Sequence, residues 1–157
     1  MSLKERIYSV LIVSAAGNLN TALTALLPES RYAPVHSVSS VSAAKRAFAQ
    51  RTYDYVIVNA PLPDEVGTRF AIDACHAEGT VVLLMARGEL HADLYDKVAE
   101  HGVFTLPKPT SRQTIITALS WMASARERLR NAEKKTLSIK EKMEEITALY
   151  EAANWKD

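Results

Sequence analysis

Four residues that end or follow apolar segments are the first candidates for chemistry. Ser14, Asn59 and Met85 each end a run of apolar residues, and Lys108 lies between two prolines directly after another such run. In one interpretation, Lys108 faces a cavity lined by the other three residues and binds a small anion or polar metabolite. In the other, which we favour, Lys108 donates hydrogen bonds to Asn59 or to backbone carbonyl oxygens and holds its loop in place.

Residue types that commonly carry catalysis or bind metals are scattered along the chain. Cys75 is the single cysteine, which excludes an internal disulfide and a cysteine-based zinc site. No two histidines have the i, i+4 spacing of a helical metal site; they are His36, His76, His91 and His101. Gly17 is not followed by a glycine-rich phosphate-binding motif. We therefore expect no enzymatic activity and no metal or other cofactor.

The composition is that of a globular protein without a strong electrostatic preference. Of 157 residues, 48% are hydrophobic and 24% are charged, and the formal net charge is +1. This composition excludes disorder as the main state, and a nucleic acid or an anionic membrane would need a local basic patch. No apolar run approaches the roughly 20 residues that cross a bilayer, and the first residues lack a secretory signal. We expect a cytoplasmic protein with no membrane partner.

Five short apolar segments alternate with segments of helical periodicity. The expected strands are residues 7–14, 33–38, 54–59, 80–85 and 103–106. This alternation predicts an α/β fold in which helices cover both faces of a parallel sheet. Ligands of such sheets lie at the carboxyl ends of the strands, which is where the four candidate residues are expected.

Three segments resemble the receiver domains of two-component response regulators. The segment YDYVIVNAPLPDEVG contains an apolar strand, an acceptor position, a Pro-Asp turn and a glycine that opens the next helix. VVLLMARGE and GVFTLPKP are similar to the fourth and fifth strands with their loops. The resemblance covers roughly residues 7–125. It implies a flavodoxin-like, doubly wound (βα)5 fold with strand order 2-1-3-4-5, and a cis bond between Lys108 and Pro109.

The functional positions of that family mostly carry other residue types in this chain. Receivers bind Mg²⁺ through an acidic pair and accept a phosphoryl group on an aspartate of their own. A Ser or Thr then binds the phosphoryl group, and this residue and an aromatic residue act as the switch. The corresponding positions are Ser14 and Ala15 for the acidic pair, Asn59 for the acceptor, and Met85 and Thr105 for the two switch residues. Only Lys108 keeps the family's residue type.

These replacements predict a receiver-like domain that is not phosphorylated. Mg²⁺ needs hard oxygen ligands, and phosphoryl transfer needs a nucleophile beside a metal. A neutral hydroxyl, a methyl group and an amide supply no negative charge to offset the cost of removing the waters of Mg²⁺, and an amide nitrogen is not a nucleophile for phosphoryl transfer. In a further interpretation Asp64 acts as a displaced acceptor, but we expect Asp64 to form the Pro-Asp turn, where it also lacks metal ligands.

The last 48 residues contain no glycine or proline and predict one long helix, capped by Thr110 or Ser111. About 40 helical residues span roughly 60 Å, twice the width of a small domain, so part of the helix should project. Apolar residues at heptad spacing predict the seam of a coiled-coil homodimer. The predicted seam consists of Met122, Leu129, Thr136, Ile139, Met143, Ile146 and Tyr150. In the alternative, the helix ends near residue 125 and the rest frays.

The chain is accordingly divided into a receiver-like domain of residues 1–125 and a helical extension of residues 126–157. Residues 134–146, KKTLSIKEKMEEI, resemble the linker that precedes an ANTAR antiterminator module, which binds nascent RNA in bacterial regulators. The chain ends too soon for the remaining helices of that module. Residues 126–142 hold seven basic and three acidic residues, which is more typical of a solvated helix flank than of an RNA site.

Two function classes follow from these observations. The first is an atypical response regulator, a pseudo-receiver that dimerises through its last helix and acts with a protein partner in signal transduction or transcription regulation, including antitermination. RNA binding by this chain alone is disfavoured. The alternative is a sensing module in which a small anion or metabolite near Lys108 takes the place of the phosphoryl group.

Overall fold

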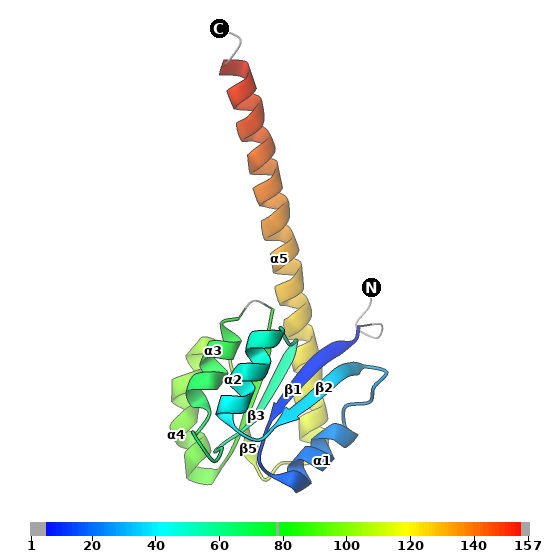
Figure 1. Cartoon of the computed structure of the whole chain (residues 1–157), viewed down its shortest axis with the longest axis vertical. Coiled ribbons are helices and arrows are strands. Elements are labelled where there is room, and N and C mark those ends of the chain that lie inside the picture. Colours follow the sequence, from blue (N-terminus) through cyan, green and yellow to red (C-terminus); the bar gives the residue numbers. More distant parts are fainter. Residues whose placement is uncertain (1–5, 78, 155–157) are drawn as a thin grey trace. The chain divides into compact units, whose positions relative to one another are not determined.

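The computed structural model describes residues 6–77 and 79–154 and shows a five-stranded parallel sheet flanked by helices (Figure 1). The strands lie in the order β2-β1-β3-β4-β5, which confirms the predicted flavodoxin-like fold. The elements are β1 Tyr8–Val13, α1 Gly17–Ala25, β2 Tyr32–Val38, α2 Val41–Gln50, β3 Tyr55–Asn59, α3 Thr68–Cys75, β4 Val81–Arg87, α4 Gly88–Val98, the 3-10 helix η2 Ala99–His101, β5 Phe104–Lys108 and α5 Arg112–Asn154.

Two apolar layers cover the two faces of the sheet. Alternate residues of the central strands point to opposite faces, because side chains of a strand alternate. On one face, residues such as Val56 and Leu84 pack against α2, α3 and α4. On the other face, residues such as Ile57 and Leu83 pack against α1 and the first part of α5. Both layers are part of one compact unit, and this unit positions the ends of all five strands.

The last two strands extend further than their apolar segments predict. β4 continues two residues beyond Met85 to Arg87, and β5 continues two residues beyond Leu106 to Lys108. The two extensions pair with each other, so that Arg87 and Lys108 are register partners in adjacent strands. The sheet thus carries two basic residues side by side at its carboxyl edge. The bond between Lys108 and Pro109 is cis, as the resemblance implies.

Gly67 allows the loop after β3 to enter α3. Its φ of 106° lies in the left-handed region, which residues with a Cβ atom rarely adopt. A Cβ atom here would also lie 3.0 Å from Cγ1 of Val58 and 3.2 Å from Cδ2 of Leu62. The glycine of the Pro-Asp-x-x-Gly segment is therefore required by both conformation and packing.

Helix α5 begins after Ser111, whose Oγ accepts a hydrogen bond of 3.1 Å from the backbone N–H of Thr114. Its first turns bury Ile115 and Leu119 against the sheet. Met122, which the heptad pattern places on the dimer seam, is completely buried in this core, because the same apolar stripe first packs on the domain. One compact unit ends at Arg126, and a second begins at Glu127. No helix in the described residues is long and apolar enough to cross a membrane.

A buried ion pair fixes α5 at the end of the first unit. Nε of Arg126 lies 2.8 Å from Oδ1 of Asp54, and both side chains are more than four-fifths buried. The other carboxylate oxygen of Asp54 accepts a 2.9 Å hydrogen bond from the backbone N–H of Ser9. The carboxylate therefore connects α5, β1 and the residue that precedes β3.

Loss of this ion pair should destabilise the domain. Arg126→Met removes the 2.8 Å ion pair from the buried carboxylate of Asp54, and we expect the free energy of unfolding to fall by about 3 kcal/mol. Denaturant unfolding at one fixed protein concentration measures the loss. The matched control is Arg69→Met, which removes the exposed pair with Asp73 and should cost less than about 1 kcal/mol. Equal losses in the two variants would contradict the role of the buried pair.

Candidate functional site

A chain of hydrogen bonds joins three of the sequence-predicted residues at the carboxyl edge of the sheet. Nζ of Lys108 donates to Oδ1 of Asn59 and, at 3.3 Å, to the carbonyl oxygen of Ala60. The amide Nδ2 of Asn59 donates in turn to Oγ of Ser14 at 3.0 Å. Ser14 and Asn59 are buried. At this edge of the sheet, one cationic and two neutral side chains are thus connected by hydrogen bonds.

The remaining predicted positions lie close by but do not join this chain of hydrogen bonds. Ala15 is exposed and offers only a methyl group. Met85 is completely buried and belongs to the core beneath α1 and α5. Thr105 is half-buried in β5, where its backbone partner is Leu84. None of these three side chains supplies a carboxylate oxygen for a metal ion.

The donor atoms at this edge do not suit Mg²⁺. The side-chain oxygens of the hydrogen-bond chain are the hydroxyl of Ser14 and the amide oxygen of Asn59, and the latter already accepts from Lys108. Mg²⁺ is usually bound through carboxylates, whose charge offsets the cost of removing its waters. Among the described residues, no three His, Cys, Asp or Glu side chains form a group that could hold a metal ion.

The corner of the domain at the carboxyl ends of β4 and β5 carries two basic residues, Arg87 and Lys108. Burial, and to a smaller extent the charge of Arg87, lower the pKa of Lys108 from its usual value. Sequence reasoning did not select Arg87, because the apolar run of the fourth strand ends at Met85. Arg87 lies two residues beyond that run in the VVLLMARGE segment, and this position could have indicated that it lies at the end of the strand.

Two cavities open at this corner and share Ala16, Asn59, Arg87 and Lys108 as walls. The larger, which we name the α1–α5 cavity, has a volume of about 530 Å³. The smaller, of about 380 Å³, lies toward Pro61 and Leu90. The α1–α5 cavity is lined by Ala16, Asn18, Leu19, Ala22, Ala25, Leu26, Asn59, Met85, Arg87, Lys108, Pro109, Thr110, Arg112 and Ile115.

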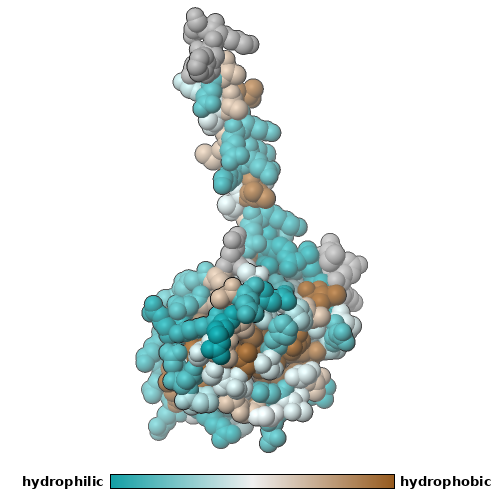
Figure 2. All heavy atoms as spheres, viewed as in Figure 1, coloured by the Kyte–Doolittle hydropathy of each residue, from teal (hydrophilic) through white to brown (hydrophobic). Residues whose placement is uncertain are grey.

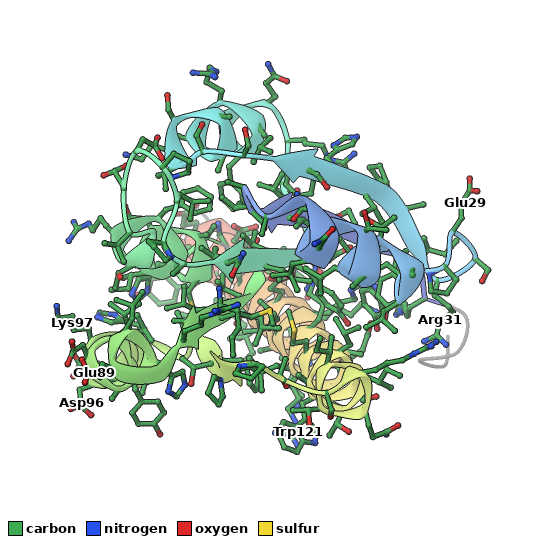
Figure 3. The ribbon with its side chains drawn as sticks, turned by 90° about the horizontal axis from the view of Figure 1, so that it is seen from below. Glu29, Arg31, Glu89, Asp96, Lys97 and Trp121 are labelled. Carbon is green, nitrogen blue, oxygen red and sulfur yellow. The ribbon has the colours of Figure 1, made fainter. Side chains whose placement is uncertain are left out.

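Figure 3 views this edge of the domain from below, with α1 and the first turns of α5 on the same face of the sheet. The acidic side chains labelled there, Glu29, Glu89 and Asp96, project from the rim of the domain. Neither cavity has an aspartate or a glutamate in its lining. The arrangement can therefore attract an anion but offers no general base or metal ligand of the carboxylate type.

Asp64 has a structural role that the sequence did not predict. Its carboxylate accepts hydrogen bonds of 2.9 Å from the backbone N–H groups of both Val41 and Ser42 at the start of α2. These hydrogen bonds lower the pKa of Asp64. A carboxylate at a helix N-terminus satisfies donors that have no partner within the helix. Asp64 thus connects the loop after β3 to α2.

The fold also brings together a histidine pair that sequence spacing could not show. Nε2 of His76 and Nδ1 of His101 lie 2.9 Å apart, although 25 residues separate them. Sγ of the neighbouring Cys75 donates to the carbonyl oxygen of His101 at 3.1 Å, and burial raises the pKa of this thiol. The raised pKa keeps Cys75 in the thiol form, which is a poor nucleophile.

Solved structures similar to this chain include receiver domains and a related regulator. The signal receiver domain of an HD domain-containing protein from Pseudomonas fluorescens Pf-5 has a TM-score of 0.71 and 23% identity, over 83% of this chain and 96% of that one. The beryllofluoride-activated NtrC4 receiver domain dimer has a TM-score of 0.66 and 19% identity, over 75% and 98%.

A third similar structure comes from a family of redox sensors in the streptococci that evolved from two-component response regulators. It has a TM-score of 0.66 and 19% identity, over 79% of this chain and 54% of that one. No protein-family model and no curated protein sequence matches the chain. At these identities the similarity shows a shared receiver fold.

The carboxylate of Asp64 should stabilise the protein in a pH-dependent way. Its pKa is lower in the folded than in the unfolded state, so its contribution is fully present above the unfolded pKa of about 3.9 and is lost as pH falls through the folded pKa. We expect Asp64→Ala to lower the Tm at pH 7 and the difference from the wild type to vanish in strong acid. Thermal unfolding monitored by circular dichroism measures both.

The control for this experiment is Glu65→Ala, which removes the adjacent exposed carboxylate and its 3.6 Å ion pair with Lys45. This variant should change the Tm little at any pH. A Tm of Asp64→Ala equal to that of the wild type at pH 7 would show that the two backbone hydrogen bonds do not stabilise α2.

Proposed function

We propose that the protein is a non-enzymatic signalling module in which a receiver fold no longer accepts a phosphoryl group. It dimerises through α5 and acts on a partner in signal transduction or transcription regulation. The receiver fold shared with the solved structures supports the signalling role. The observation that carries the proposal is the hydrogen-bond chain from Lys108 through Asn59 to Ser14, which occupies the position of the acidic cluster in receivers.

The chemistry of this chain argues against phosphoryl transfer. Phosphoryl transfer requires a nucleophilic oxygen and a metal ion that neutralises the developing charge. The amide of Asn59 is not a nucleophile, and its oxygen and nitrogen are both used in hydrogen bonds. Asp64 does not replace it, because its carboxylate accepts hydrogen bonds from α2. A signal would therefore enter this domain by another route.

Dimerisation is proposed from the exposed apolar side chains of α5 beyond residue 126. The proposed seam begins at Leu129 and continues through Thr136, Ile139, Met143, Ile146 and Tyr150. Ile139, Met143 and Ile146 are 60 to 66% exposed in one chain. Figure 2 shows such apolar side chains interspersed along the otherwise hydrophilic helix. Burial of this heptad stripe against a second copy would remove it from water.

The output is proposed to lie in gene regulation, with antitermination as one form of it. The segment 134–146 resembles the linker that precedes an RNA-binding antiterminator module. Residues 126–142 carry an excess of basic residues on an exposed helix, which suits a solvated flank of a dimer. We assign RNA binding to a further module or a protein partner rather than to these residues.

A second candidate function is the sensing of a small ligand. The observation that favours it is the α1–α5 cavity, in which Arg87 and Lys108 lie beside apolar walls at the carboxyl edge of the sheet. In this function, ligand binding replaces phosphorylation as the input. The two candidate functions are compatible, because the first concerns the absence of phosphorylation and the second concerns the binding of a small ligand.

Incubation with Mg²⁺ and acetyl phosphate tests the absence of phosphorylation. We expect no gain of a phosphoryl group by intact-mass spectrometry, because the acceptor is an amide and the metal ligands are absent. Asn59→Asp alone should also remain unmodified, since Ser14 and Ala15 still supply no carboxylate. A receiver domain known to accept phosphoryl groups from the same donor serves as the positive control. A stoichiometric gain in the wild type would refute the proposal.

Light scattering on the full chain tests the seam. We expect a dimer for the wild type and a monomer, or at least about tenfold weaker association, for Ile139→Lys, because a buried lysine would lose its hydration. Ser138→Lys introduces the same charge one residue earlier, off the heptad stripe, and should remain dimeric. A monomeric wild type, or equal dissociation of both variants, would disprove dimerisation through this stripe.

A further inference from the structure

We propose that the α1–α5 cavity binds a small amphiphilic anion, with its anionic head group at Arg87 and Lys108 and an aliphatic body along α1 and the start of α5. The proposal rests on the ligand-sensing function above and specifies its ligand class.

The charge of the corner is unbalanced. Arg87 and Lys108 are register partners on adjacent strands, which places their backbones about 4.8 Å apart. Like charges at this separation repel each other. In the described part of the chain, no carboxylate forms an ion pair with Arg87, Lys108 or Arg112, the third basic residue of the lining. A bound anion would compensate this cluster.

Lys108 is held in the lining of the cavity by hydrogen bonds. Its hydrogen bonds go to the neutral oxygens of Asn59 and Ala60, which hold the ammonium group without neutralising it. Half-burial of Lys108 removes part of the water that would otherwise screen the charge. Arg87 is exposed and can present its planar guanidinium to a carboxylate or a phosphate.

The walls of the cavity call for an apolar body behind the head group. Leu19, Leu26, Met85 and Ile115 line it together with alanines of α1. A volume of about 530 Å³ lies within the range of small-molecule sites, roughly 300 to 1,000 Å³. A bare phosphate ion would occupy a small part of this volume and leave the apolar walls in contact with water.

The body is more compatible with an aliphatic chain than with a nucleobase. The lining contains no aromatic side chain on which a base could stack, and its uncharged polar side chains are those of Asn18, Asn59 and Thr110. The amide of Asn59 is already engaged with Ser14 and Lys108. The site therefore selects a ligand by its negative charge and by its apolar surface area.

Ligand binding would act directly on the helix that carries the proposed seam. Ile115 and Arg112 belong to the first turns of α5, and Leu19 and Ala22 belong to α1. A ligand between these residues contacts both helices and the end of the sheet. This contact offers an input to α5 that needs no phosphoryl group.

Isothermal titration calorimetry with octyl phosphate and with octanoate, below their micellar concentrations, tests the ligand class on the full chain. We expect saturable binding of one molecule per chain for both. Octan-1-ol, which lacks the charge, and inorganic phosphate, which lacks the chain, should each bind at least about tenfold more weakly. Octyltrimethylammonium, which reverses the charge, should not bind.

Four variants locate the site. Ala22→Trp fills the cavity from an exposed position of α1 and should abolish binding, whereas Ala92→Trp makes the same change at an exposed position of α4 outside the lining. Arg87→Met should weaken octyl phosphate binding at least about tenfold and leave the hydrogen bonds of Lys108 intact. Lys97→Met removes an exposed charge of α4, which points outward in Figure 3, and should leave binding unchanged.

Three results would overturn the proposal. Equal affinity for octan-1-ol and octyl phosphate would show an apolar groove without anion recognition. Equal affinity for inorganic phosphate and octyl phosphate would show that the site binds the anionic group and does not recognise an aliphatic chain. Binding that persists in both Ala22→Trp and Arg87→Met would place the ligand elsewhere. Phosphorylation and dimer formation are measured in separate experiments. If the ligand-binding experiment fails, those results are unchanged and only the proposed ligand class is withdrawn.

Discussion

The hydrogen bonds between Lys108, Asn59 and Ser14 are the interaction on which the account of this protein depends. A parallel sheet brings the ends of its strands to one edge, and in the receiver fold this edge is where chemistry takes place. Here a cation donates to an amide and the amide donates to a hydroxyl, which satisfies all three side chains without a carboxylate. The edge is held together by neutral acceptors and keeps an uncompensated positive charge.

Helix α5 connects the different parts of this account. Its first turns bury apolar residues against the sheet and line the cavity, and Arg126 then fixes it through the carboxylate of Asp54. Beyond that residue its apolar side chains are exposed and repeat at heptad spacing. A single helix therefore contributes to the core, to the proposed ligand site and to the proposed dimer.

The strands and their order could be predicted because their apolar runs and the receiver-like segments are local in sequence. The site was predicted in part. Ser14, Asn59 and Lys108 were selected from strand ends, and the structure brings them into one hydrogen-bond chain. Arg87 was missed because pairing with β5 extends β4 beyond its apolar run. Met122 was assigned to the seam because a heptad stripe and a core-facing stripe share the same spacing.

Contacts between distant segments could not be read from sequence. Asp54 and Arg126 are separated by 72 residues, and nothing in either segment shows that a carboxylate and a guanidinium will meet beside β1. The same holds for Asp64, which lies in a turn motif but accepts hydrogen bonds from the start of α2, 22 and 23 residues away. Both are polar contacts that the packing of apolar layers brings together.

The central claim, that this edge of the sheet has lost its affinity for a divalent cation, is tested most directly by following the side-chain amide signals of Asn59 by NMR during a titration with Mg²⁺. We expect these signals to stay in place up to millimolar Mg²⁺. The Ser14→Asp, Ala15→Asp, Asn59→Asp triple variant, with carboxylates at all three positions, should show saturable shifts at the same edge. Saturable shifts of the Asn59 amide in the wild type would contradict the claim.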